Sequence, residues 1–132
     1  MGQPAAKQSD QVTATDIHIV MVPSPGGPVP TPVPHMFSGI LDGNLSPNVN
    51  VMGMPAAVVG STATNTPIHI PMPPGVSFQM PPQNRAQILM GSPTVLVNGM
   101  MMARNGDTAT TCNDPVDLPA GTVIAVGSVM VG

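Results

Sequence analysis

Residues 91–107 read GSPTVLVNGMMMARNGD, and a similar stretch occurs earlier in the chain. When residues 46–64 (SPNVNVMGMPAAVVGSTAT) are placed over residues 92–110 (SPTVLVNGMMMARNGDTAT), 11 of the 19 positions carry the same residue type without a gap. The identities include Ser, Pro, Gly and Thr as well as apolar residues, so biased composition alone is a poor explanation. Such repetition indicates one supersecondary unit that is used twice.

Each copy predicts a short β-hairpin. Val-rich runs at 49–51 and 95–97 favour strands, because β-branched side chains suit a pleated surface. A dipeptide ending in glycine follows each run, and the Asn-Gly at 98–99 is the strongest short hairpin signal. A second short strand is expected after each turn, ending at Gly60 or Gly106.

Other parts of the chain are organised around these two hairpins. The tail VIAVGSVMV (123–131) is similar to the opening of a third copy that stops at the C-terminus. Two proline-heavy stretches, 23–34 and 67–82, are expected to be extended loops laid over the hairpin scaffold. The polar residues 1–15 are expected to be a flexible extension, and residues 16–132 to form the folded domain.

Composition favours an all-β protein. The 132 residues include 18 Pro and 14 Gly, which break helices, whereas 42% of residues are apolar, too many for a simply disordered chain. The two phenylalanines are the only aromatic residues, so the core of such a domain would be thin. Thin β-rich cores often need a metal ion or a partner for stability.

Charge and hydropathy exclude several classes of protein. The net charge is −3 with only three basic residues, so the basic surface that nucleic-acid binding requires is missing. The N-terminus has no apolar signal core, and the longest apolar stretch (121–132) is too short to span a bilayer. A single cysteine cannot form an internal disulfide. We therefore expect the protein to be made and folded in the cytoplasm.

The three histidines and the single cysteine are the candidate metal ligands. A His₃Cys set fits tetrahedral zinc with no His or Cys left over, although the spacing of these residues matches no local zinc-finger motif. The alternative is that these histidines and the cysteine are ordinary buried residues that bind no metal. If they bind one ion, it would join four distant segments of the chain. The four residues are His18, His35, His69 and Cys112.

Catalysis is disfavoured by the same inventory. A catalytic zinc needs an open coordination position and usually a carboxylate base. The chain contains no Glu, and a shell of four protein ligands leaves no place for a substrate. Asp114 and Asp117 lie near Cys112 in sequence, but the intervening Pro115 predicts a turn. We therefore expect no enzymatic activity.

With these motifs the chain resembles the PAAR-repeat proteins, which cap the central spike of type VI secretion systems and related contractile injection systems. The resemblance lies in Pro55-Ala56-Ala57 and, most specifically, in GSPTVLVNGMMMARNGD (91–107). It extends over about residues 16–132. The chain departs from the pattern at Met101-Met102, where Pro-Ala is usual, and at Val58 and Ser61, which replace Arg and Asp.

The resemblance implies a fold, a cofactor and a partner. The fold would be a small cone of β-hairpins with a zinc ion near the apex, held by His18, His35, His69 and Cys112. The wide base would sit on a trimeric β-helical spike protein, one tip per trimer, through a pseudo-threefold arrangement. The tip would aid membrane puncture, carry cargo non-covalently, and be delivered outside the cell or into a target cell.

Two alternatives from other classes remain open on the residues alone. One is a small zinc-dependent enzyme, which the absence of Glu weakens. The other is a zinc-free β-solenoid adhesin, for which a complete His₃Cys set would have no purpose. Metal content and chelator sensitivity separate all three classes of protein.

Overall fold

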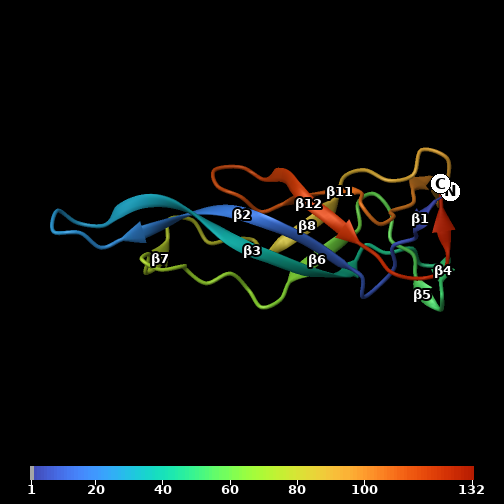
Figure 1. Ribbon diagram of the computed structural model, residues 1–132, viewed down its shortest axis with the longest axis horizontal. Helices are drawn as coiled ribbons and strands as arrows, with labels where there is room; N and C mark the ends of the chain where they lie inside the picture. The colour runs from blue at the N-terminus through green and yellow to red at the C-terminus, as the bar shows by residue number, and fades with distance from the viewer. Residues whose placement is uncertain (1) are drawn as a thin grey trace.

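The computed structural model describes residues 2–132, which form an elongated all-β domain that tapers from a wide base to a narrow hairpin tip (Figure 1). The described residues contain no helix, and so none that could cross a membrane. The predicted all-β class is confirmed. The strands are β1 (Gln3–Pro4), β2 (Gln11–Val22), β3 (Val29–Gly43), β4 (Asn50–Val51), β5 (Met54–Pro55), β6 (Thr62–Asn65), β7 (Ser77–Phe78), β8 (Arg85–Ile88), β9 (Leu96–Val97), β10 (Met100–Met101), β11 (Thr108–Thr111), β12 (Leu118–Ile124) and β13 (Met130–Val131).

Six strands form a closed antiparallel ring in the middle of the domain. Their order is β12-β11-β8-β6-β3-β2, and the pairing of β12 with β2 closes the ring. Closure leaves no strand edge exposed at this level. The interior is narrow because it is filled largely by alanines around a few larger side chains. Its buried residues include Val12, Phe37, Leu41, Ala63, Ala86, Ile88, Ala109 and Val123.

Two of the small hairpins at the base are the predicted repeats. β4 pairs with β5, and β9 pairs with β10. Both residues of each turn have positive φ, 51° and 83° at Met52-Gly53 and 54° and 81° at Asn98-Gly99. Such turns match the right-handed twist of the strands that they join. The predicted hairpins are therefore confirmed, although their strands are shorter than expected.

A third hairpin is built from the two ends of the chain. β1 pairs with β13, with Gln3 opposite Val131 and Pro4 opposite Met130, and the two ends meet at the base in Figure 1. The expectation of a third copy in the tail is confirmed, and its second half is GQPAAKQSD (2–10). The prediction of a separate extension over 1–15 is wrong for residues 3–15, which belong to the folded domain; Met1 lies outside the described residues.

A ring of three backbone hydrogen bonds relates the three copies. The Ala6 N–H donates to the Ala103 carbonyl (2.9 Å), Ala103 to Ala57 (2.9 Å), and Ala57 to Ala6 (3.0 Å). All three alanines have no exposed surface. The closed cycle gives the base an approximate threefold arrangement, in which a larger side chain at any of these positions would push the copies apart.

The first proline-rich stretch is mostly strand rather than the predicted loop. Only residues 23–28 form the turn at the narrow tip, and Val29–Pro34 pair with β2 as part of β3. Pro30, Pro32 and Pro34 alternate along the strand. Because β6 pairs with β3 only from Gly39 onward, the missing N–H groups of these prolines face an edge without a partner strand. The second stretch, 67–82, is a loop apart from β7.

Candidate metal centre

The four sequence-predicted ligands lie together in the narrow half of the domain. His18 is on β2 and His35 on β3, whereas His69 and Cys112 follow the ends of β6 and β11. All four are buried, with 1%, 2%, 7% and 2% of their surfaces exposed, respectively. Residues far apart in sequence therefore lie close together in the interior.

The three imidazole rings surround a common space. Their centroids are 4.8 Å apart for His18 and His69, 5.4 Å for His18 and His35, and 5.5 Å for His35 and His69. The Cys112 Sγ lies 3.7 Å from the His18 Nε2. Histidine nitrogens and a cysteine sulfur are atoms that can hold a metal ion.

Asp16 is a member of the cluster that sequence reasoning missed. Donor atoms of Asp16, His18, His69 and Cys112 all lie within 4.8 Å of one another, and Asp16 has no exposed surface. The signal was available, because residues two apart in a strand point to the same face, and Asp16 is two residues before His18. The alternating burial of β2 places both side chains inward.

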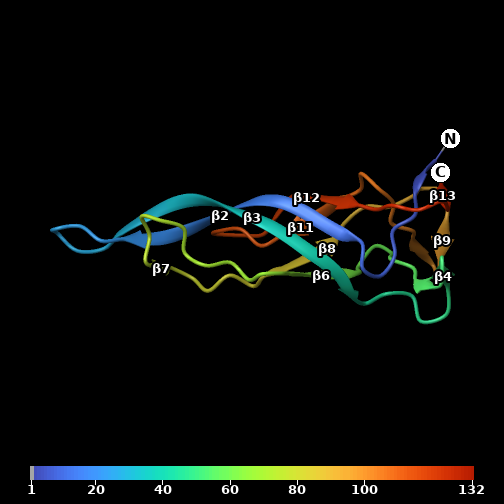
Figure 2. The same cartoon turned by 60° about the horizontal axis from the view of Figure 1, so that its bottom comes forward.

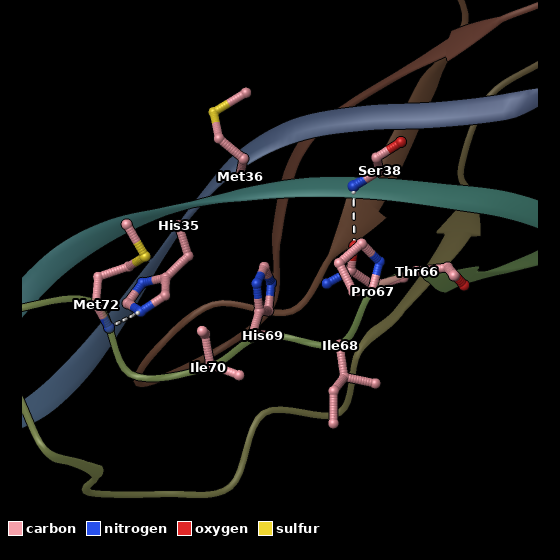
Figure 3. A pocket seen from close by; sticks show the side chains of 10 residues that line it. His35, Met36, Ser38, Thr66, Pro67, Ile68, His69, Ile70 and Met72 are labelled. Carbon is pink, nitrogen blue, oxygen red and sulfur yellow. Dashed lines mark hydrogen bonds between the residues drawn. The ribbon is translucent and has the colours of Figure 1, made fainter.

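His35 is placed differently from the other members. Its Nδ1–H donates to the Val33 carbonyl (2.8 Å), and its Nε2 accepts a hydrogen bond from the Met72 N–H (3.3 Å). Figure 3 shows this second contact beside the ring of His69. The structure brings the His35 ring to the cluster, but its donor atoms lie outside the set that includes Asp16.

Backbone contacts fix the segments that carry the other ligands. The His69 N–H donates to the Asn84 Oδ1 (2.7 Å), which anchors the loop that follows β6. Beyond Cys112, the Asn113 Oδ1 accepts from the Ile17 N–H (2.7 Å), and the Asp114 Oδ2 accepts from the Ile19 N–H (2.9 Å). The Cys112 segment is thereby held against β2, where His18 lies.

His18 has a buried nitrogen without a hydrogen bond. Its Nδ1 lies 3.5 Å from the Asp114 Oδ2, near enough for electrostatic attraction but without hydrogen-bond geometry. A carboxylate behind the second nitrogen of a metal-bound histidine is a common arrangement, which fixes the ring and raises its basicity. Asp114, considered from sequence only as a weak base candidate, is thus placed to orient His18.

Burial shifts the protonation equilibria of two members of the cluster. Desolvation, followed by the repulsion of nearby Asp16, raises the pKa of the Cys112 thiol to about 11. Desolvation and the proximity of His69 lower the pKa of His18. In the metal-free protein at neutral pH both groups are therefore uncharged. Zinc binding requires the thiolate, so it would release the proton from Cys112.

Two pockets reach the cluster from outside. One of about 270 Å³ is lined by His35, His69 and apolar residues of the loop after β6, including Ile70 and Met72 (Figure 3). The other, of about 70 Å³, reaches His18 and Cys112. A buried donor set with a path from outside could hold a metal ion.

A comparison with protein families identifies the family of the chain. The sequence model of the PAAR motif matches residues 20–116, more than two thirds of the chain. No curated protein matches the chain. The matched segment includes His35, His69 and Cys112, and both complete base hairpins. The chain therefore belongs to the PAAR motif family.

Proposed function

We propose that the protein is the tip that caps the spike of a contractile injection apparatus, with a structural zinc ion in its narrow half. The observation that carries this proposal is the buried histidine–cysteine cluster, which joins four segments of a tapering PAAR-family domain. In small zinc peptides the metal contributes about 10–16 kcal/mol to folding. A narrow core rich in alanine makes such a contribution important.

The proposed ligands are His18, His35, His69 and Cys112. The similar distances between the three ring centroids support the inclusion of His35. Its Nδ1–H is bound to the Val33 carbonyl, which leaves Nε2 as the ligand atom once the contact with the Met72 N–H is exchanged for the ion. Four protein ligands leave no position for a substrate, in keeping with a structural rather than a catalytic ion.

The base supplies the surface for a partner. Its three strand pairs lie at the wide end in Figure 2, and each carries large apolar side chains that are exposed. A trimeric β-helical spike, with one tip per trimer, offers three chain ends to this approximately threefold surface. Methionine side chains suit such a contact because they adapt to irregular surfaces. The exposed residues are Val49, Met52, Met54, Leu96, Met100, Val129 and Met130.

The β2–β3 hairpin beyond Asp16 and the loop after β6 have the composition expected of a part that enters membranes. Residues 17–38 and 66–82 contain no Asp, Glu, Lys or Arg. Because charged side chains are unfavourable in the bilayer interior, their absence reduces the resistance to puncture. We also propose that the tip is assembled in the cytoplasm, carries any cargo non-covalently, and leaves the cell with the spike.

Metal analysis and co-purification test the proposal. The purified protein is expected to contain one zinc per chain and to lose thermal stability when a chelator removes the ion. Co-expression with a trimeric spike protein is expected to yield a complex with one tip per trimer by native mass spectrometry. Metal-free protein whose melting ignores chelator would overturn the zinc site, and failure to bind any spike trimer would overturn the tip assignment.

A further inference from the structure

Asp16 is a buried acidic residue that has no Lys or Arg partner among the described ion pairs. It has no exposed surface, and the described ion pairs of Lys and Arg join Lys7 to Asp10 and Arg104 to Asp107 instead. The only titratable base in contact with it among residues 2–132 is His69. A carboxylate is strongly disfavoured in a buried site unless cations and hydrogen bonds compensate it.

The two oxygens of Asp16 have different surroundings. Its Oδ1 accepts from the Thr111 Oγ1 (2.6 Å) and the Asn113 Nδ2 (3.4 Å). Its Oδ2 lies 3.1 Å from the His69 Nε2 and 3.4 Å from the Cys112 Sγ. One oxygen is therefore held by neutral donors, and the other faces two proposed zinc ligands.

Each histidine of the cluster turns one ring nitrogen toward a protein acceptor. These contacts are His18 Nδ1 with Asp114, His35 Nδ1 with Val33, and His69 Nε2 with Asp16. Carboxylates and carbonyls that hold the outer nitrogen of a metal-bound histidine fix its tautomer. With these contacts kept, the Nε2 of His18 and His35 and the Nδ1 of His69 would be the nitrogens left to bind the ion.

We propose that Asp16 is the positioning residue of the metal centre, a carboxylate that orients His69 and balances the ion's charge together with the Cys112 thiolate. The inference rests on the zinc site proposed above and adds a residue to it. Two negative groups match the charge of a divalent cation. Asp114 behind His18 is slightly less buried than Asp16, with 7% of its side chain exposed, and lines the 70 Å³ pocket.

Metal affinity tests the role of Asp16 directly. Asp16→Asn keeps the shape of the side chain but removes its charge, and we expect it to weaken zinc binding about 10–100-fold in competition with a chromophoric chelator. Asp42→Asn is the matched control, because it removes the same charge from an exposed position and is expected to bind zinc like the wild type. Unchanged affinity in Asp16→Asn would overturn the inference.

Thermal melting at pH 8 separates this role from a purely structural one. In the zinc-loaded protein Asp16→Asn is expected to lower the melting temperature. In the metal-free protein it is expected to leave the temperature unchanged or raise it, because an uncompensated buried charge is removed. Thr111→Val deletes a hydrogen-bond donor to Asp16 but keeps the carboxyl group. It is expected to lower the melting temperature of both the zinc-loaded and the metal-free protein. An equal fall in both forms of Asp16→Asn would assign the residue a structural role only.

A measurement on the wild type covers the case in which Asp16→Asn does not fold. Two-bond ¹H–¹⁵N spectra of the zinc-loaded protein are expected to show His69 protonated at Nε2, with His18 and His35 protonated at Nδ1. Zinc bound to the His69 Nε2 would overturn the inference and leave the zinc site intact. A wild-type protein that binds no zinc would instead overturn the proposed site and the role of Asp16 with it.

Discussion

The Cys112 Sγ and the His18 Nε2 lie 3.7 Å apart, although 94 positions separate them in the sequence. Their contact joins the segment after β11 to β2, at the point where the closed ring of strands continues into the narrow tip. A metal ion shared by these two residues would prevent the segments from separating. The predictions below follow from this contact and from the base on which the tip stands.

Replacing the cysteine ligand is expected to destabilise the zinc-loaded protein. Cys112→Ser removes the thiolate, so a loss of at least about 3 kcal/mol and a fall of about 10 °C or more in melting temperature are expected. Calorimetry of zinc-loaded protein measures it. Ser128→Ala changes a polar residue that is exposed at the base and serves as the control. Equal melting of Cys112→Ser and wild type would exclude Cys112 as a ligand.

The metal-free protein is expected to be most stable between about pH 7 and 9. The pKa of His18 is lowered by burial, so its contribution is present above the ordinary value of 6.5 and is lost as pH falls toward the folded-state value. The pKa of Cys112 is raised from 9.0 to about 11, so its contribution is lost as pH rises between these values. Urea denaturation from pH 5 to 11 measures both limits.

The predicted loss of stability of the metal-free protein above pH 9 can be tested with a control variant. Cys112→Ser contains no thiol to titrate, so its stability is expected to remain level between pH 9 and 11, where that of the metal-free wild type declines. Parallel curves for the two proteins in this range would show that another group causes the loss.

The alanine cycle at the base is expected to tolerate no larger side chain. Ala57→Val adds two methyl groups at a position without exposed surface, and a loss of about 1–3 kcal/mol is expected. Chemical denaturation measures the change. Ala120→Val makes the same substitution at an exposed position of β12 and is expected to be nearly neutral.

A charge on the base is expected to abolish spike binding without unfolding the tip. Leu96 is 61% exposed on β9, so Leu96→Asp is expected to keep the wild-type melting temperature but lose co-purification with the spike trimer. Val76→Asp places the same charge on an exposed residue of the narrow half and is expected to retain binding. Retention by both variants would place the contact elsewhere.

The sequence predicted those parts of the fold that depend on residues close together in the chain. The Asn98-Gly99 and Met52-Gly53 turns specify their hairpins through residues that accept positive φ, and the tail similarity pointed to a third copy. The second half of that copy, GQPAAKQSD, looks like an extension in sequence because the strand partners of Gln3 and Pro4 lie 128 and 126 residues away. Pro30, Pro32 and Pro34 suggested a loop because sequence alone does not reveal which edge of a strand lacks a partner.

The sequence could predict which residue types belong to the candidate site, but not how they are arranged in space. Three histidines and one cysteine predict a zinc shell; the structure brings their rings and the sulfur near one another, but the donor atoms within 4.8 Å of one another include Asp16 and not His35. Asp16 was missed because a buried carboxylate looks like a surface one in sequence. Its environment is set by Thr111 and His69, which only the closure of the ring brings near.

Because β1 pairs with β13, the two ends of the described chain lie side by side, and the base can be built from a chain that is opened at another turn. A circular permutant that links Gly132 to Gly2 through a short glycine bridge, and opens between Met52 and Gly53, would keep every strand pairing of the base. The same pairing sets an order for biosynthesis. Gln3 and Pro4 have no strand partner until Met130 and Val131 have been synthesised, so the β1–β13 pair cannot form before the residues of the two local hairpins are in place.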